Sequence, residues 1–316
     1  MLALLLAACA APSPTTPRER IVVPAGARFS AITDTLVAHG LVQHPLWFRG
    51  LARLRGIHRT TQAGTYDLPR GQSAWALLTA LRDGRVAMKR FTSAEGLTLP
   101  EVAQEAAEQL GLPADSFLAA ARDTALIREL GLDGKDLEGY LLPETYTIPV
   151  TTTARELVRL MAQQFLASWD PAWDAGLVER RLSRRQAVIL ASIVEGEAKL
   201  DAERPIIAAV YDNRVRLGMP LQADPTVQYA IWLKTGKRKK RLFEKDYLIR
   251  SPYNTYIIPG LPPGPVNSPG LASIRAAIEP ASVPYLYFVA DTGGHHVFTE
   301  TYQEHLRAIR RVRGNR

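Results

Sequence analysis

The alternation of apolar and polar positions predicts short strands that lead into helices. The recurring sequence pattern consists of a β-prone run, a turn with glycine, a Ser or Thr able to cap a helix, and apolar residues at helical spacing. It begins at Ile21, Thr65 and Glu95, with helices expected from Ser30 and Ser73 and near Pro100. The intervals are irregular, which argues against a solenoid of equal repeats. Small strand-helix units predict an α+β module over residues 21–90.

Beyond residue 90 the pattern predicts longer helices separated by loops. An acidic first turn with a proline and the glycine at Gly218 suit the two ends of the last long helix. After it the chain is rich in loops, and it closes with a buried strand over 285–290, a hairpin and a basic helix. We therefore expect a mixed α/β domain over residues 91–316. Helices are expected at about 154–169, 183–197 and 201–217, after an amphipathic stretch over about 98–132.

Composition places the chain among soluble globular proteins. Its 316 residues are 47% hydrophobic and 22% charged, which is enough for two domains. The formal net charge of +8 indicates an anionic partner, which is a membrane surface, an acidic polymer or nucleic acid. Charge alone does not choose among these three.

The N-terminal segment holds the only cysteine of the sequence, Cys9, which excludes a disulfide framework and a cysteine-based metal site. The apolar run 2–11 is shorter than the roughly 20 residues of a spanning helix but fits the apolar part of a signal peptide. Leu6-Ala7-Ala8-Cys9 resembles the lipobox of bacterial lipoproteins, although a charged start is missing. We interpret residues 1–20 as a signal or anchor remnant with a linker, or as part of a longer leader. The alternative is a segment without a targeting role.

Two glutamates, Glu195 and Glu197, close an otherwise apolar predicted helix. Positions i and i+2 point in very different directions, so the carboxylates form no close pair. Glu197 stacks over Leu190, Ile193 and Val194 and continues the apolar stripe. A carboxyl over apolar side chains is desolvated, which raises its pKa, as a general acid near neutral pH requires. The alternative is that both glutamates are solvated charges at a helix end.

Several further motifs follow one another in a fixed order. Among them are Leu137-Glu138-Gly139-Tyr140, Glu195-Gly196-Glu197 and Tyr253-Asn254-Thr255-Tyr256, and the others occupy residues 203–204, 210–219, 221–229, 260–264 and 285–290. From about Ile21 onward the chain resembles the MltG (YceG-like) family of endolytic peptidoglycan transglycosylases.

The resemblance implies that Glu197, the second glutamate of the Glu-x-Glu motif, is catalytic. It also implies a LysM-like module over about residues 21–86 and a single-pass membrane anchor. The family usually has Thr or Ser after this glutamate, whereas this chain has Ala198, so a hydrogen bond from that hydroxyl is absent.

The implied reaction needs no metal and no cofactor. One carboxylic acid protonates the glycosidic oxygen that leaves N-acetylmuramic acid, and the carboxylate then takes a proton from the 6-hydroxyl, which closes a 1,6-anhydro ring. An ordinary glycoside hydrolase uses two carboxylates, so a single glutamate suffices here. The implied role is to cleave nascent strands and end their elongation.

Further side chains suit N-acetyl sugars because aromatic rings stack and amides hydrogen-bond. We expect each of them to support catalysis, contact substrate or have a structural role; they are Glu138, Glu195, Asn213, Arg214, Gln222, Asp224, Tyr253, Asn254 and Tyr256. The adjacent His295 and His296 point to opposite faces of a strand, so we expect no metal shared with His305. The basic run 237–241 is interpreted as a solvated loop or as a contact with anionic lipid or glycan.

The expected partners are peptidoglycan glycan strands, the membrane through the N-terminal anchor, and peptidoglycan synthases. The expected location is the cell envelope, facing the periplasm or exterior, with anchoring in the inner membrane or as a lipoprotein through Cys9. One alternative is a non-catalytic peptidoglycan-binding or division scaffold protein. Another is a nucleic-acid-binding protein, which the absence of a recognisable nucleic-acid motif disfavours.

Overall fold

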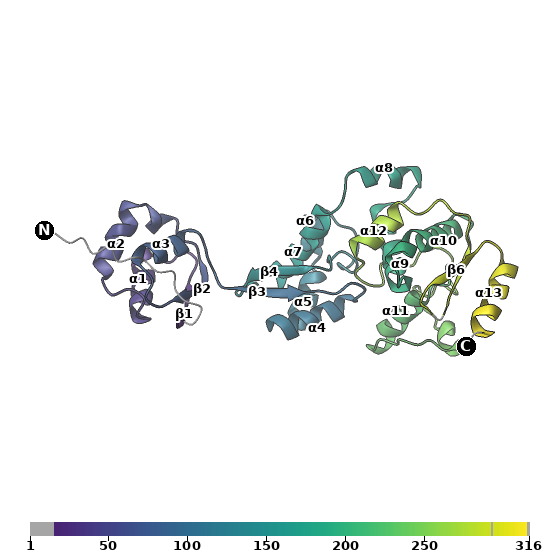
Figure 1. Cartoon of the computed structure of the whole chain (residues 1–316), viewed down its shortest axis with the longest axis horizontal. Coiled ribbons are helices and arrows are strands. Elements are labelled where there is room, and N and C mark those ends of the chain that lie inside the picture. The colour runs from purple at the N-terminus through teal and green to yellow at the C-terminus, as the bar shows by residue number, and fades with distance from the viewer. Residues whose placement is uncertain (1–15, 292, 315–316) are drawn as a thin grey trace. The chain divides into compact units, whose positions relative to one another are not determined.

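The computed structural model describes residues 16–291 and 293–314 (Figure 1). The predicted lipobox at Cys9 and the apolar run 2–11 lie outside the described residues, so the anchor stays a prediction. Within the described part, none of the helices has the length and apolar character needed to cross a bilayer.

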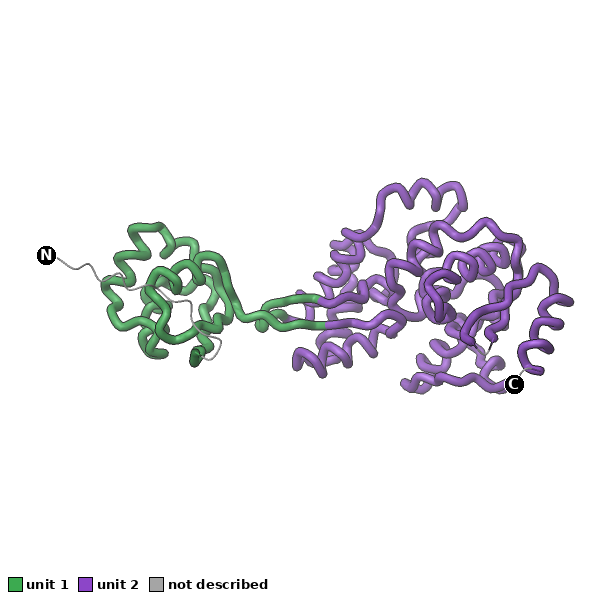
Figure 2. The backbone as a smooth tube through the Cα atoms, viewed as in Figure 1, with its two compact units in different colours: residues 1–91, 146–152 green, residues 92–145, 153–316 purple. Residues whose placement is uncertain are grey.

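The chain forms two compact units (Figure 2). Of the described residues, unit 1 contains 16–91 and 146–152, and unit 2 contains 92–145, 153–291 and 293–314. The chain therefore returns to unit 1 once, because β3 (Met88–Thr92) pairs with β4 (Thr145–Pro149). The boundary at residue 90 and the LysM-like character of the first module stay predictions.

Unit 1 is a two-stranded antiparallel sheet packed with short helices. Its core is apolar and continuous, with Ile21, Leu36, Phe48, Tyr66 and Leu78 buried. The first helix starts one residue before the predicted Ser30, and its N-cap makes no side-chain hydrogen bond. Besides most of β3 and β4, the elements of unit 1 are β1 (Arg18–Val23), α1 (Phe29–Ala38), α2 (Pro45–Leu54), η1 (Ile57–Arg59), β2 (Gly64–Pro69) and α3 (Ala74–Arg82).

Unit 2 is mainly helical and ends in a small hairpin against the last helix. Its first helices are α4 (Leu99–Leu110), α5 (Ala114–Ala121), α6 (Thr124–Glu129), α7 (Ala154–Ala167) and α8 (Ala172–Glu179). The following elements are α9 (Arg184–Glu197), η2 (Asp201–Glu203), α10 (Arg204–Arg216), α11 (Asp224–Thr235), η3 (Glu244–Leu248), α12 (Leu271–Ile278), β5 (Tyr287–Ala290), β6 (His296–Thr299) and α13 (Tyr302–Gly314).

Helix α9 lies at the centre of unit 2. The helix begins with a capping box. The Ser183 hydroxyl accepts from the backbone N–H of Gln186, and the Gln186 side-chain oxygen accepts from the backbone N–H of Ser183. Residues 187–194 are all buried, because α10, α11 and α12 pack around the helix (Figure 1). Because α9 is held on several sides, the direction in which its last residues point is fixed.

The structure divides one predicted stretch and corrects another. The amphipathic stretch 98–132 consists of three helices, α4, α5 and α6, because the Gly111 C-cap has a left-handed backbone and Asp123 caps α6 anew. The predicted buried strand is half-buried over β5, since it pairs only with β6 in a hairpin. The described residues thus form mixed α/β structure in which each sheet has two strands.

Candidate active site

Glu197, the last residue of α9, borders a cavity of about 230 Å³ in unit 2. The cavity mixes aromatic, amide and charged groups, which is the character of a site that binds a polar ligand. Its other lining residues are Tyr211, Arg214, Leu221, Gln222, Asp224, Tyr256, Phe288 and His305.

The Glu197 carboxyl group is bound from two sides. The Tyr211 hydroxyl donates to its Oε1 at 3.0 Å, and the backbone N–H of Asp224 donates to the carboxyl as well. Burial, followed by the nearby Asp224 carboxylate, raises the pKa of Glu197 to about 7, and the two hydrogen bonds oppose this rise. At neutral pH the group is therefore present in both acid and base forms.

Asp224 is held at the start of α11, where the helix N-terminus favours a negative charge. The Tyr256 hydroxyl donates to its Oδ1 at 2.7 Å, and the Tyr247 hydroxyl lies 3.5 Å from Oδ2. Burial and the Asp224 charge raise the pKa of both tyrosines, so their hydroxyls stay protonated. The carboxylate is thus fixed as a hydrogen-bond acceptor beside Glu197.

Arg214 supplies a cation to the cavity wall. Its guanidinium donates to the carbonyl oxygens of Leu286 and Leu221 at 2.7 and 2.8 Å and lies 5.1 Å from the ring centre of Tyr287. Burial lowers the pKa of Arg214. Gln222, whose backbone has a positive φ of 53°, donates its N–H to the Thr255 carbonyl at 3.0 Å. A strained non-glycine residue of this kind is typical of functional sites.

Glu195 points away from this cavity. Its Oε2 accepts from the backbone N–H of Gly270 at 3.0 Å and lies 3.2 Å from the guanidinium of Arg204. Arg204 in turn donates to the Ser273 hydroxyl on α12. The two glutamates therefore have different surroundings, and Glu195 joins α9 to α10 and α12.

Gly196, between the two glutamates, permits α9 and α11 to approach closely. A Cβ atom at this position would lie 2.5 Å from Cγ and 2.7 Å from Cβ of Pro225. Any side chain would push the helices apart. The glycine thus keeps Glu197 beside the N–H of Asp224.

Several predicted site residues do not line the Glu197 cavity in the described structure. Asn213 donates to the carbonyl oxygens of Val283 and Tyr285, and so holds the segment before β5. Fully buried Asn254 donates to the carbonyls of Tyr247 and Ile249 and accepts from the N–H of Tyr256. These contacts shape the loop that presents Tyr256.

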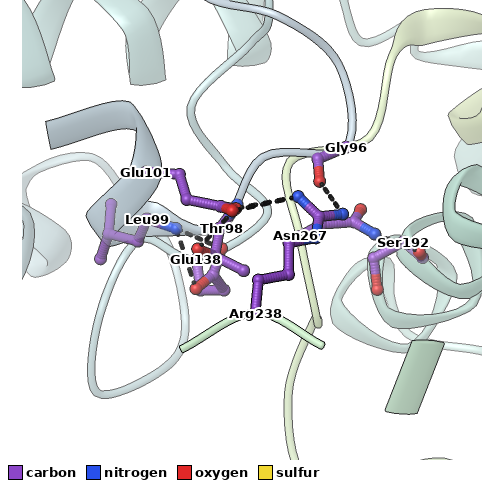
Figure 3. Close-up of polar contacts among 8 residues, drawn as sticks. All are labelled: Gly96, Thr98, Leu99, Glu101, Glu138, Ser192, Arg238 and Asn267. Carbon is purple, nitrogen blue, oxygen red and sulfur yellow. Dashed lines mark hydrogen bonds and ion pairs between the residues drawn. The ribbon is translucent and has the colours of Figure 1, made fainter. Parts of the chain in front are cut away.

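Tyr253 packs against Tyr229 with ring centres 4.8 Å apart, and Glu138 lies deeper in the same region. The Leu99 N–H, at the start of α4, donates to both carboxyl oxygens of Glu138 (Figure 3). The Tyr229 hydroxyl lies 3.1 Å from Oε2 of Glu138. Burial, and next the charge of Asp136, raises the pKa of Glu138 to about 8. Glu138 also borders a second cavity of about 380 Å³.

Loop residues near Glu138 are held by ion pairs and amide contacts. Arg238, from the predicted solvated basic run, binds the Glu101 carboxylate at 3.0 Å and the Gly96 carbonyl at 3.2 Å (Figure 3). Asn267 donates to the carbonyl of Ser192 on α9 at 2.8 Å. The basic run is therefore partly anchored to α4.

Tyr211, Phe288 and Leu221 were not predicted as site residues, although all lie within the motifs of the sequence. His305 was considered only for a metal, yet it lines the cavity beside Glu197. Burial and the Arg214 charge lower its pKa. The adjacent histidines differ: His296 bonds Glu203 at 2.6 Å, whereas His295 is exposed.

Comparison with known proteins extends over nearly the whole described chain. The sequence model of the YceG-like family matches residues 21–311. A Bacillus subtilis (strain 168) protein named endolytic murein transglycosylase is 33% identical over 304 residues, which cover 91% of this chain and 83% of that protein. A Streptococcus pneumoniae (strain D39) protein of the same name is 32% identical over 319 residues, which cover 91% of this chain and 57% of that protein.

A solved structure has a similar fold. It is that of a putative YceG-like protein from Listeria monocytogenes, with a TM-score of 0.63 and 28% sequence identity. The match covers 93% of this chain and 100% of the solved chain.

Replacing Gly196 with Ala is expected to separate α9 from α11. Overpacking of this kind costs about 1–3 kcal/mol, and the Glu197 carboxyl would move away from the Asp224 N–H. Thermal unfolding and an NMR titration of Glu197 measure the two effects. Gly176→Ala in α8 is the matched control, because a Cβ there meets nothing within 4 Å; equal behaviour of the two variants would contradict the packing argument.

Glu138 makes stability depend on pH. Because its folded-state pKa of about 8 lies above the unfolded value near 4.3, its stabilisation is complete below about pH 4 and is lost as pH rises through about 8. Relative to Glu138→Gln, the protein should therefore lose stability by up to about 1.4 kcal/mol per pH unit over this window. Urea unfolding of both proteins between about pH 5 and about pH 9 measures this loss, and parallel curves would refute the assignment.

Proposed function

This chain belongs to the YceG-like family, and we propose that it acts as an endolytic murein transglycosylase with Glu197 as acid and base. It cleaves the bond between N-acetylmuramic acid and N-acetylglucosamine within nascent peptidoglycan strands and leaves 1,6-anhydro-N-acetylmuramic acid ends. The observation that carries the assignment of Glu197 is a carboxyl group with a pKa of about 7 at the wall of a polar cavity. Two relatives bear the name of this activity.

The reaction uses one carboxyl group for two proton transfers. Protonated Glu197 gives its proton to the glycosidic oxygen as the bond from the anomeric carbon breaks, and the leaving strand ends in a hydroxyl. The Glu197 carboxylate then removes the proton from the 6-hydroxyl of the same sugar, whose oxygen bonds to the anomeric carbon. The enzyme returns to its starting state, and no water is consumed.

Neighbouring groups support both steps. The Tyr211 hydroxyl and the Asp224 N–H stabilise the carboxylate after it has lost its proton. The Asp224 charge favours a positive charge that develops at the anomeric carbon. Gln222 and Tyr256 line the cavity and supply an amide and a ring for N-acetyl groups and sugar faces.

The rest of the chain is proposed to keep the enzyme close to its substrate. Unit 1 is proposed to be LysM-like and to increase retention on peptidoglycan without chemistry of its own. The N-terminal segment is proposed to hold the enzyme at the envelope membrane, near peptidoglycan synthases. A non-catalytic scaffold would bind glycan strands but release no fragments, so digestion by purified protein separates the two functions.

Replacing Glu197 with Gln keeps shape and hydrogen bonding but removes the transferable proton. Activity on purified sacculi should fall by at least about 10²- to 10⁴-fold, with folding retained. Glu195→Gln is the control, since it loses the Arg204 ion pair but leaves the cavity intact; its loss per folded molecule should be smaller. Mass spectrometry of the fragments should show 1,6-anhydro ends. Reducing ends would indicate a hydrolase, and an active Glu197→Gln protein would end the assignment.

The pH profile reports the acid form of Glu197. Because the first step needs the protonated carboxyl and its pKa is about 7, kcat/KM should fall as pH rises above this value. Asp224→Asn removes the charge that helps to raise the pKa, so the descending limb should move to lower pH. Rates across the pH range for both proteins test this, and an unmoved limb would contradict the proposed coupling.

A further inference from the structure

Helix α2 of unit 1 exposes large apolar side chains to solvent. Leu46, Trp47 and Leu54 have 82%, 62% and 80% of their surface exposed. A shallow apolar hollow, lined in part by Leu46 and Trp47, lies at the start of the helix. A contiguous apolar surface of this kind usually marks an interaction site.

The exposed residues share one face of the helix. At about 100° per residue, Leu46, Trp47, Gly50, Arg53 and Leu54 fall within an arc of roughly 120°, and each is exposed. Phe48 and Ala52, on the other side, are buried in the core of unit 1. The outer face is therefore not a continuation of the core, and we refer to these five exposed residues as the α2 stripe.

The sequence interval that contains the α2 stripe carries arginines but no acidic residue. No acidic residue occurs between Asp34 and Asp67, whereas this interval contains four arginines, Arg49, Arg53, Arg55 and Arg59. Arg49 pairs with Asp34 and Arg55 lies over the Trp75 ring. Arg53 and Arg59 are exposed, and no ion pair of either occurs within the described residues. A surface of this composition is complementary to an anionic and apolar boundary.

We propose that the α2 stripe lies in the interface of an anionic lipid bilayer. Trp47 and the two leucines enter the boundary between headgroups and acyl chains, and Arg53 and Arg59 contact lipid phosphates while their stems cover apolar surface. The inference rests on the envelope location of the proposed function, but not on catalysis.

Two further observations favour lipid over a glycan strand. Sugar recognition requires amide or carboxylate groups beside the aromatic ring, yet the α2 stripe offers leucines, a glycine and an arginine. In sequence, only residues 12–17 separate the apolar run 2–11 from β1. Six extended residues span at most about 20 Å, so an anchor in that run would keep unit 1 near the membrane.

The experiment measures binding of the full chain to vesicles of phosphatidylglycerol and phosphatidylcholine, with phosphatidylcholine alone as reference. Leu46→Ser/Trp47→Ser/Leu54→Ser should weaken binding to the anionic vesicles at least about tenfold, and Arg53→Gln/Arg59→Gln should weaken it in a salt-dependent manner. Brominated lipids should quench tryptophan fluorescence, and Trp47→Phe should remove that quenching. Circular dichroism confirms that each variant is folded.

The matched control is Val178→Ser/Leu248→Ser, which removes equally exposed apolar residues of unit 2, at 76% and 74%; it should bind as the unmodified chain does. Glu197→Gln should also bind vesicles normally, so failure of the catalytic assignment remains distinguishable. Unchanged vesicle binding and quenching in the stripe variants would overturn the proposal. So would selective loss of binding to purified glycan strands, because it would assign the stripe to glycan.

Discussion

The close contact between α9 and α11 is the constraint on which the active site depends. Gly196 has no side chain where Pro225 lies, so the end of one helix meets the start of the other. This contact puts the Glu197 carboxyl beside the N–H and the carboxylate of Asp224. The N-terminal dipole of α11 stabilises the Asp224 charge, and that charge helps to hold the proton on Glu197. The packing of α9 against α11 therefore helps to set the pKa of Glu197.

The remaining groups of the cavity keep the pKa of Glu197 close to neutral pH. Burial favours the neutral form of Glu197, but the hydrogen bond from Tyr211 and the positive charge of Arg214 lower its pKa. Arg214 is itself fixed by backbone carbonyls around Leu221 and Leu286, so the cation does not collapse onto the carboxylate. A group near its titration point can donate a proton and later accept one, which is what a single-residue mechanism requires.

The sequence predicted what depends on neighbours along the chain. The caps at Ser73, Thr98 and Ser183 begin helices as expected, and helical geometry separates Glu195 from Glu197. The sequence pattern could not reveal that Tyr211 and Phe288 line the cavity with Glu197, because they belong to α10 and β5 and come close to Glu197 only when these elements pack. Asn213 was a candidate site residue because it lies in a motif. In the structure its side chain instead donates to carbonyl oxygens of a segment about 70 residues away, and the local sequence pattern does not reveal such a contact.

Three glutamates of unit 2 show why burial alone does not identify a catalytic acid. The Glu195 side chain is largely covered, but it is paired with Arg204 and a backbone N–H and points away from the cavity. Glu138 retains a proton to higher pH than Glu197, yet the Leu99 N–H contacts both of its oxygens and Tyr229 one of them. Glu197 combines a pKa of about 7 with a cavity that also holds an amide, a cation and a second carboxylate. Because proton transfer needs a partner within hydrogen-bond reach, that combination, and not the pKa by itself, separates the proposed acid from its two neighbours.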